Sequence, residues 1–189
     1  MSGGTTKNNR RPARTNMNTL TLFKKVKAFV LDVDGVLTDG SLLLLDDGQQ
    51  ARTMYIRDGY ALQLAVKRGY LVLVISGGES AAVRNRLNKL GVSDVHMAVI
   101  DKTAILRSFM QRHGLVTEQV LYMGDDMPDL KVMQLAGMPA CPHDAAPEIR
   151  EISKYISPYP GGRGCVRDVI EKVLKLNGHW DEEGSIPAR

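Results

Sequence analysis

The amino-acid sequence predicts an α/β fold in three layers, with helices covering both faces of a parallel sheet. Short apolar, β-prone runs such as 70–75 alternate with longer stretches that have helical spacing and end at glycine, which is typical of strand–helix–strand units. Polar and acidic residues directly follow several of the apolar runs, and parallel sheets bind ligands at those strand ends. The 189 residues suffice for one such domain with its own core.

The first predicted strand covers residues 27–33, because residues 29–31 are apolar and β-prone, as expected of a strand that is buried on both faces. Two acids, Asp32 and Asp34, stand where this strand should end, and Gly35 then lets the backbone turn. Two carboxylates this close suit a hard cation such as Mg²⁺. An ordinary strand exit with solvated acids is the alternative interpretation.

Residues 41–56 predict a β-hairpin, because Asp47-Gly48 is a turn signal between two extended runs. The first arm is unusually apolar, with leucine at positions 42–45. A two-stranded hairpin with apolar faces is not stable alone in water. We therefore expect the outer face of this flap to pack on something else, most simply on another copy of the chain.

The remaining elements follow from apolar spacing and glycine stops. In residues 58–68, apolar side chains at helical spacing indicate a helix that Gly69 ends. Pro128 suits the first turn of another helix. Further helices are expected at 79–90, 102–113, 147–152 and 165–176, and further strands at 70–75, 95–98, 119–123, 139–141 and 154–156.

The basic residues are unevenly distributed along the chain. The net charge is +4, but seven of the 25 basic residues precede Asp32, the first acid, and the rest of the chain has 18 basic and 21 acidic residues. We expect residues 1–22 to be a disordered basic leader, residues 23–178 to form the domain and residues 179–189 to be a tail. The leader offers no aromatic platform, so the charge does not indicate nucleic-acid binding.

Cysteine usage and apolar run lengths point to a cytoplasmic protein. Cys141 and Cys165 have no CxxC or zinc-ligand spacing and are interpreted as buried free thiols in a reducing compartment. The longest apolar runs are far too short to span a bilayer, and the first twenty residues contain no apolar segment of the signal-peptide type.

Acids and a lysine at the predicted strand ends together indicate phosphoryl transfer. A carboxylate such as Asp32 can attack phosphorus and form an aspartyl phosphate, but it repels an anionic phosphomonoester. Mg²⁺ held by Asp32, the backbone carbonyl of Asp34 and Asp125 would offset that repulsion. Lys102 supplies a further cation for the developing charge.

Further groups at the strand ends complete this chemistry. Ser76 and the amides of Gly77 and Gly78 precede a helix and can donate to phosphate oxygens. Asp34 would protonate the leaving oxygen and later take a proton from the attacking water.

Each of these features also has a plainer interpretation. Lys102 can be a surface lysine at a helix start, the Ser-Gly-Gly sequence a turn, and the acids of 125–129 a cluster stabilised by a helix dipole. Their occurrence together, each at a strand end, favours the functional interpretation.

The sequence DVDGVLTDG at 32–40, followed by Ser76, Lys102 and GDDMPD at 124–129, resembles the four motifs of the haloacid dehalogenase-like hydrolase superfamily. The resemblance implies a Rossmann-like sheet and a bound Mg²⁺. It also implies site roles: Asp32 as nucleophile, Asp34 as general acid and base, Asp125 as metal ligand, and Asp126 and Asp129 as supporting acids.

Residues 27–178 are more narrowly similar to the 3-deoxy-D-manno-octulosonate 8-phosphate phosphatases, through RDGY at 57–60, Arg86 and GGRGCVR at 161–167. Those enzymes are cytoplasmic homotetramers of lipopolysaccharide biosynthesis. One departure is Gly78, where many members carry Arg. The resemblance implies that the following residues lie near the phosphate or the sugar acid: Arg57, Asp58, Gly59, Arg86 and Lys102.

The spacing of the motifs leaves no room for a cap domain, since only a hairpin and a helix separate Asp34 from Ser76. Phosphoryl transfer benefits from a site shielded from water, so we expect neighbouring subunits to cover it. The loop 161–164 could carry Arg163 to a neighbouring site as a substrate contact, although surface solvation is an equally good interpretation of that residue.

The sequence therefore predicts a capless, Mg²⁺-dependent phosphatase that acts on a phosphorylated 2-keto-3-deoxy sugar acid, preferably the octulosonate. A nonulosonate 9-phosphate is the nearest alternative substrate. A non-catalytic, oligomeric scaffold that binds sugar acids is an alternative from another class, and a nucleic-acid binder that works through the leader is a third.

Overall fold

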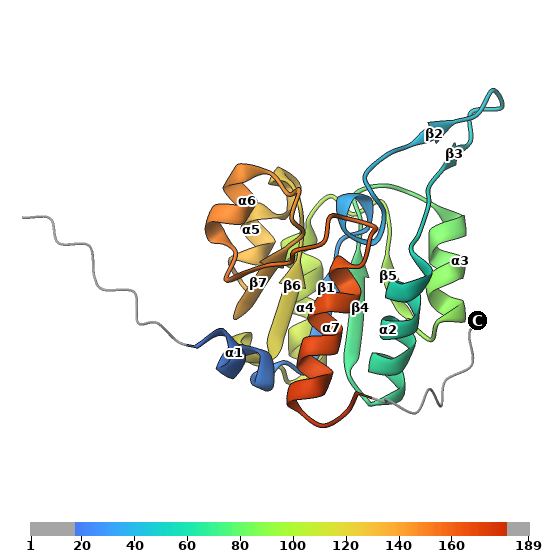
Figure 1. Cartoon of the computed structure of the whole chain (residues 1–189). Helices are drawn as coiled ribbons and strands as arrows, with labels where there is room; N and C mark the ends of the chain where they lie inside the picture. The colour runs from blue at the N-terminus through green and yellow to red at the C-terminus, as the bar shows by residue number, and fades with distance from the viewer. Residues whose placement is uncertain (1–17, 181–189) are drawn as a thin grey trace, which may run out of the picture.

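The structure, a computed structural model, describes residues 18–180. Its centre is a parallel sheet, as predicted, and the strand order is β5-β4-β1-β6-β7-β8 (Figure 1). Every pairing in this sheet is parallel, and β1 lies between β4 and β6. Its strands are β1 (Ala28–Leu31), β4 (Leu71–Ile75), β5 (Asp94–His96), β6 (Val120–Met123), β7 (Met138–Cys141) and β8 (Tyr155–Ile156).

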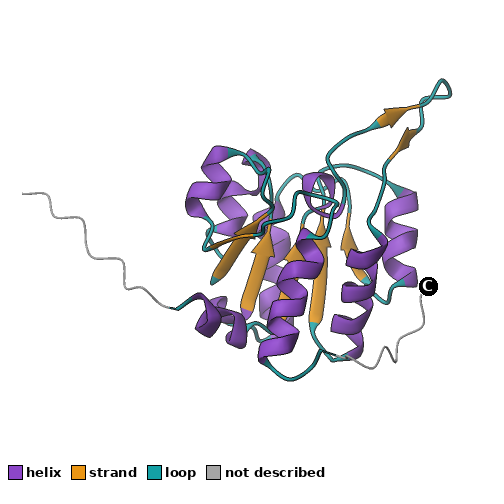
Figure 2. Cartoon of the chain, in the orientation of Figure 1, coloured by secondary structure: helices purple, strands orange, loops and turns teal. Residues whose placement is uncertain are grey.

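Helices cover both faces of the sheet, which confirms the three-layer prediction (Figure 2). The first face carries α1 (Thr19–Lys25), α2 (Ile56–Lys67), α3 (Ala81–Lys89) and α7 (Cys165–Leu176). The second carries α4 (Lys102–His113), α5 (Leu130–Met133) and α6 (Pro147–Ile152). Short 3-10 turns at Thr117–Gln119 and Met127–Asp129, labelled η2 and η3, precede β6 and α5.

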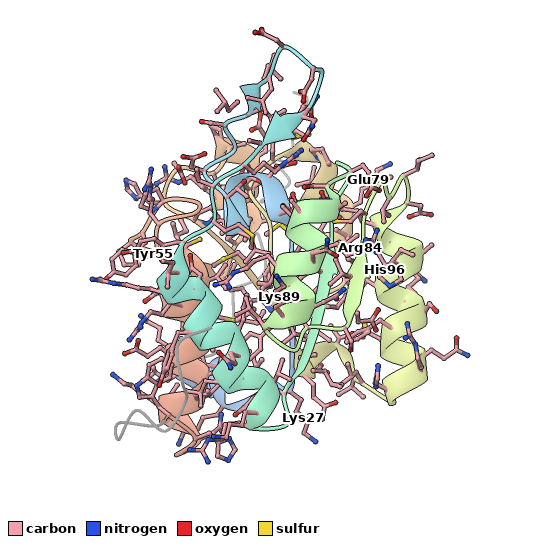
Figure 3. All side chains as sticks on the ribbon, turned by 90° about the vertical axis from the view of Figure 1, so that its right-hand side faces the viewer. Lys27, Tyr55, Glu79, Arg84, Lys89 and His96 are labelled. Atoms are coloured by element: carbon pink, nitrogen blue, oxygen red, sulfur yellow. The ribbon has the colours of Figure 1, made fainter. Side chains whose placement is uncertain are left out.

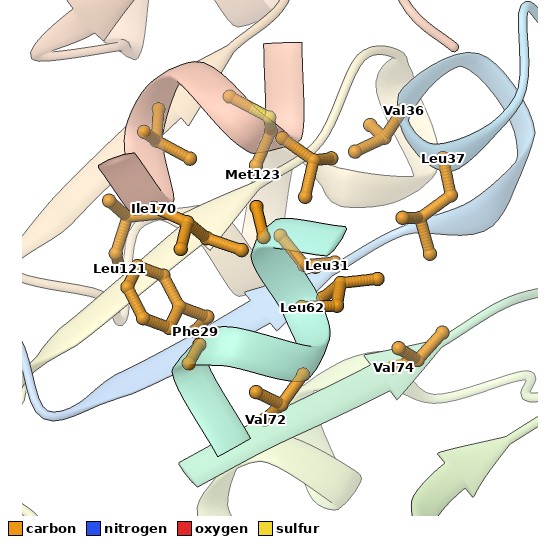
Figure 4. Packing of buried hydrophobic residues seen from close by; sticks show 14 of the residues in the cluster. Phe29, Leu31, Val36, Leu37, Leu62, Val72, Val74, Leu121, Met123 and Ile170 are labelled. Carbon is orange, nitrogen blue, oxygen red and sulfur yellow. The ribbon is translucent and has the colours of Figure 1, made fainter. Parts of the chain in front are cut away.

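The core is divided by the sheet into two apolar clusters because successive side chains of a strand point to opposite faces. In β1, Phe29 and Leu31 join one cluster, and Ala28 and Val30 join the other. Figure 4 shows the first cluster, in which Leu62 of α2 packs near Phe29 and Leu31. All of β1 is therefore buried, and the first polar side chain after it, Asp32, emerges at the strand's carboxyl end.

The predicted hairpin is present and projects from the carboxyl-end side of the sheet (Figure 1). Its strands are very short, β2 (Leu43–Leu44) and β3 (Gln50–Ala51), and Gly48 takes a positive φ of 82° in the turn. The leucines at 42–45 have exposed fractions between 42% and 69%. One chain therefore leaves this apolar surface uncovered.

The predicted leader is wrong at its C-terminal end. Residues 19–25 form α1, in which Asn18 caps the first turn by accepting a hydrogen bond from the Leu20 amide at 3.1 Å. Leu22 and Phe23 are buried against α7 and the sheet. The helix was not predicted because it has only seven residues, too few for its apolar spacing to stand out. The rest of the predicted leader lies outside the described residues.

The C-terminal boundary also differs from the prediction. His179 and Trp180, expected to begin the tail, pack on the domain. The His179 Nδ1 lies 2.9 Å from the Tyr70 hydroxyl, and the Trp180 ring meets the Tyr60 ring edge-on. In the described part of the chain, no helix combines the length and apolar character needed to cross a membrane.

Candidate active site

The site lies at the carboxyl ends of the three adjacent strands β4, β1 and β6. Figure 3 labels Lys27 at the end where β1 begins and Glu79 toward the opposite end, from which the hairpin rises. Because the strands are parallel neighbours, the residues that follow them meet: Asp32 after β1, Ser76 after β4 and Asp125 after β6. The polar residues predicted at separate strand ends are thus brought together by topology.

Lys102 lies at the centre of the buried charges. Its Nζ is 3.0 Å from Oδ1 of Asp32 and 2.8 Å from Oδ1 of Asp129. Asp101 caps the start of α4 by accepting from the Ala104 amide, and this cap places Lys102 at the first position of the helix. The lysine side chain is only 6% exposed, so the interpretation as a surface lysine is excluded.

Three carboxylates could hold a metal ion here. Asp32, Asp125 and Asp129 each offer one oxygen, and these oxygens lie within 4.8 Å of one another. The oxygen-only donor set suits a hard divalent cation. Asp129 was expected only to support the site, but it is 1% exposed and accepts hydrogen bonds from Lys102 and, at 2.8 Å, from the Tyr122 hydroxyl. Tyr122 was not anticipated, because its sequence context is that of an ordinary core tyrosine.

Two glycines allow the acids to approach one another. A Cβ on Gly35, whose φ is +83°, would lie 2.0 Å from Oδ2 of Asp125. A Cβ on Gly124 would lie 2.5 Å from Cγ of Asp129. These contacts are shorter than any side chain tolerates, so only glycine at both positions permits the cluster.

Asp32 and Asp125 have pKa values above those of ordinary carboxyl groups. Burial raises the pKa of Asp32 to about 8, the charge of Asp129 adds to this shift, and Lys102 opposes it. Burial, followed by the charges of Asp129 and Asp126, raises the pKa of Asp125 to about 7. Burial lowers the pKa of Lys102, but the two acids outweigh it and the net shift is upward. One ammonium therefore does not balance three carboxylates, and a divalent cation would.

The acids open onto a pocket of about 300 Å³. Ser76, Gly77 and Gly78 line it together with Asp32, Asp34 and Lys102. The Ser76 side chain is buried, and its Oγ accepts a hydrogen bond from the Gly78 amide at 3.0 Å. The pocket has room for a phosphate group beside the nucleophile predicted from sequence.

Arg52, a residue that the sequence did not single out, pairs with Asp34. Its Nε lies 2.7 Å from Oδ1 and its Nη2 lies 3.2 Å from Oδ2 of Asp34. Arg52 directly follows β3, so the base of the hairpin places it beside Asp34. No local pattern in the sequence distinguishes this arginine from a solvated one.

Comparison with known proteins agrees with this geometry. Residues 89–167 match the haloacid dehalogenase-like hydrolase family. The 3-deoxy-D-manno-octulosonate 8-phosphate phosphatase of Escherichia coli K12 is 30% identical over 159 residues, which are 84% of this chain and 85% of that enzyme. The Salmonella typhi enzyme of the same name is 30% identical over 163 residues, which are 86% of this chain and 87% of that enzyme. The chain belongs to this phosphatase family.

Solved structures extend the similarity to three dimensions. The Moraxella catarrhalis 3-deoxy-D-manno-octulosonate 8-phosphate phosphatase, solved with magnesium, phosphate and a KDO molecule, has a TM-score of 0.81 and 34% identity, covering 85% of this chain and 92% of that one. The cobalt-bound Haemophilus influenzae enzyme has a TM-score of 0.79 and 28% identity, covering 83% and 92%. The phosphatase thus shares its fold with enzymes that bind divalent metals.

Two predicted substrate contacts of the phosphatase lie elsewhere in the single chain. Arg57 and Arg163 line a separate pocket of about 540 Å³, with Arg167, Lys172 and other residues of α7. The Arg163 Nη2 is 3.6 Å from Asp39 Oδ2. Within one chain, these arginines are therefore not part of the pocket around Asp32.

Three further predicted contacts lie where α2 meets α3 and α7. Asp58 is 2% exposed and accepts hydrogen bonds from the Gly164 amide at 3.2 Å and the Arg167 amide at 2.7 Å, so it caps the start of α7. A Cβ on Gly59 would lie 3.1 Å from Nη2 of Arg86, which places that arginine against α2. Asp58 thus has a structural role within one chain, and a substrate role for Asp58, Gly59 and Arg86 stays a prediction.

Asp126 has a local role in the structure. Its Oδ1 accepts from the Met127 amide at 2.8 Å and caps η3, and its charge contributes to the raised pKa of Asp125. It lines the pocket but is not one of the three clustered acids.

Proposed function

We propose that the phosphatase hydrolyses 3-deoxy-D-manno-octulosonate 8-phosphate to the free sugar acid and phosphate, in a Mg²⁺-dependent reaction of lipopolysaccharide biosynthesis. The observation that carries the proposal is the convergence of Lys102 and the clustered acids on Asp32 beside a pocket of phosphate size. The names and the bound KDO of the similar enzymes support the choice of substrate.

The proposed first step is attack by a carboxylate oxygen of Asp32 on phosphorus, which forms an aspartyl phosphate as the bond to the sugar oxygen breaks. Lys102, 3.0 Å from Asp32, offsets the negative charge that gathers there. Asp34 gives a proton to the departing sugar oxygen. Ser76 and the Gly77 amide donate to the phosphoryl oxygens, while the Gly78 amide holds the Ser76 hydroxyl.

The proposed second step releases phosphate. Asp34 takes a proton from a water molecule, whose oxygen attacks phosphorus and breaks its bond to the Asp32 oxygen. Both carboxyl groups then return to their starting states, and the net reaction is hydrolysis of one phosphomonoester bond.

Asp32 and Asp125 are the proposed side-chain ligands of Mg²⁺, with the Asp34 carbonyl as a further ligand. Asp129 belongs to the same oxygen cluster and holds Lys102. When bound, Mg²⁺ would reduce repulsion between the carboxylate and the phosphomonoester.

The proposed active form is a homo-oligomer, most simply the tetramer that the family resemblance predicts. The exposed leucines of the hairpin support this, because they form an apolar surface that one chain leaves in water. The cationic pocket with Arg57 and Arg163 would then lie near a neighbour's active site, which would reconcile their predicted role with their position. The free, buried cysteines 141 and 165 support a reducing, cytoplasmic setting.

The decisive experiment compares wild type with Asp32→Asn. We expect the variant to lose at least about a thousandfold in kcat while it keeps its far-ultraviolet circular dichroism and its oligomeric state. Wild-type turnover by the variant would remove the nucleophile assignment and revive the sugar-acid-binding scaffold. Phosphate release from the nonulosonate 9-phosphate, measured in parallel, decides between the two sugar acids.

A further inference from the structure

Arg52, at the base of the hairpin, fixes the orientation of the Asp34 carboxylate. The two side chains form a two-pronged ion pair, with the Nε and Nη2 of Arg52 on the two oxygens of Asp34. The Arg52 side chain is 4% exposed and that of Asp34 is 36% exposed. Because a guanidinium is planar and its donors are fixed relative to one another, such a pair sets both position and plane of the carboxylate.

The third nitrogen of Arg52 has no acceptor. Among residues 18–180, Nη1 is the one buried side-chain nitrogen or oxygen without a hydrogen-bond partner. A buried donor of this kind normally costs about 1–3 kcal/mol, more when it is charged, and such groups are rare. A charged donor left at this cost, beside Asp34 at the active-site pocket, suits an acceptor oxygen on a bound ligand.

Arg52 lies directly beside two residues of the active-site pocket. Asp34 and Gly78 both line the active-site pocket, and a Cβ on Gly78 would lie only 3.1 Å from Nη2 of Arg52. Gly78 thus leaves room for the guanidinium at the edge of the pocket. Lys102 pairs with the nucleophile Asp32, whereas Arg52 pairs with Asp34, the acid assigned to the leaving oxygen. The two cations therefore serve the phosphoryl group and the leaving group respectively.

We infer that Arg52 is a specificity-determining residue, whose Nη1 donates to the carboxylate of the sugar-acid leaving group while Nε and Nη2 keep Asp34 in place. The inference rests on the proposed function, because it assigns the donor to the sugar acid of that substrate. A carboxylate is the acceptor that suits a buried guanidinium best, since charge and planar geometry both match.

The test compares two substrates in Arg52→Met, which keeps most of the side-chain volume. One substrate is 3-deoxy-D-manno-octulosonate 8-phosphate, and the other is p-nitrophenyl phosphate, whose leaving group has no carboxylate. We expect KM for the sugar-acid phosphate to rise about 10- to 100-fold, as for loss of a hydrogen bond to a charged group, and KM for p-nitrophenyl phosphate to change less than about threefold. Arg112→Met is the control, because Arg112 forms an exposed ion pair with Asp94 away from the pocket.

Equal increases of KM for both substrates would overturn the inference and place Nη1 on the phosphoryl group. A fall in kcat with unchanged KM would also overturn it and leave Arg52 as a positioning residue only. Arg52→Lys provides a second variant: one ammonium cannot serve Asp34 and a substrate carboxylate together, so we expect kcat near wild type with KM still raised. Failure of the proposed function is recognised separately, because wild type itself would then not turn over the sugar-acid phosphate, and the inference would fall with it.

Discussion

Asp129 shows how much one buried side chain decides in this site. It accepts from the Lys102 ammonium and the Tyr122 hydroxyl through Oδ1, and from the Asp125 amide at 3.3 Å through Oδ2. The carboxylate thereby links the start of α4 to β6 and to the loop that follows β6. Its charge also raises the pKa of both Asp32 and Asp125. Positioning and electrostatics in the cluster therefore depend on the same residue.

Asp58 is a buried acid whose ionisation makes the stability of the protein depend on pH. Burial raises its pKa from 3.8 to about 6, against the two amides that it accepts from. A group whose pKa is raised by folding stabilises the protein fully below its unfolded pKa, and this contribution is lost as the pH rises through the folded value. The stability that Asp58 contributes is thus lost between about pH 4 and pH 6.

We predict that Asp58→Asn lowers stability at pH 4, because its amide nitrogen cannot accept from both Gly164 and Arg167, by about 1–2 kcal/mol. The deficit relative to wild type should shrink as the pH rises from 4 to 7, since only wild type loses the contribution described above. Urea unfolding at several pH values measures this difference. A deficit that grows with pH would show that the amides and the helix dipole outweigh burial.

At the scale of the element, α1 provides a sharp comparison of two truncations. Deletion of residues 1–17 leaves Asn18 to cap the helix, and we predict that turnover and the denaturation midpoint stay within error of wild type. Deletion of residues 1–25 removes the buried Leu22 and Phe23 and should cost roughly 3–5 kcal/mol of unfolding free energy.

Both truncations are followed by urea unfolding and phosphate release. A large loss of activity in the shorter deletion would instead support the alternative of a nucleic-acid binder that works through the basic leader. Equal stability of the two forms would mean that α1 contributes little to the core.

The hairpin of β2 and β3 exposes leucines through which we expect the chains to assemble. Leu43 and Leu44 are 64% and 69% exposed in one chain, and in the proposed oligomer they are covered. We predict that Leu43→Asp with Leu44→Asp shifts the protein to monomers at micromolar concentration, measured by light scattering after size exclusion. Leu20→Asp is the matched control, because Leu20 is 53% exposed on α1, at the opposite end of the molecule from the hairpin (Figure 1). An unchanged mass in the double variant would remove the hairpin from the interface.

Sequence reasoning succeeded for elements whose signals are local and failed where distant elements had to be placed. Strands β4 and β6 and helix α7 have strong apolar patterns and clear ends, and they lie within about two residues of the predictions. Helix α1 is too short for its apolar spacing to stand out. The pairing of Arg52 with Asp34 and the cap that Asp58 gives to α7 depend on tertiary packing between segments far apart in sequence.

At the scale of the whole molecule, the strand order creates the site. Asp32 and Asp125 are far apart in sequence but follow neighbouring strands, because β1 pairs with β6 in register from Ala28–Val120 to Leu31–Met123. That the acids converge could be predicted from a parallel sheet alone. The distances between their carboxylates also depend on the strand register and on the close packing at Gly35 and Gly124, which the sequence does not show. The backbone therefore gathers two buried acids and the half-buried Asp125 around a single ammonium, an arrangement that lacks positive charge.

That shortage of positive charge predicts a stabilising response to metal. A ligand that binds only the folded state adds about 2.7 kcal/mol at a concentration of one hundred times its Kd, and for a domain of this size this raises Tm by roughly 5–10 °C. We expect saturating Mg²⁺ to give a shift of this order in wild type and in Asp94→Asn, whose carboxylate lies outside the acid cluster. Asp125→Asn should lose most of the response, because one charge and one ligand oxygen leave the cluster. The same Tm shift in Asp125→Asn as in wild type would mean that Mg²⁺ stabilises the protein from another site. A Tm shift found only in chains with all three acids would mean that Mg²⁺ binds at the acid cluster, the proposed site of catalysis.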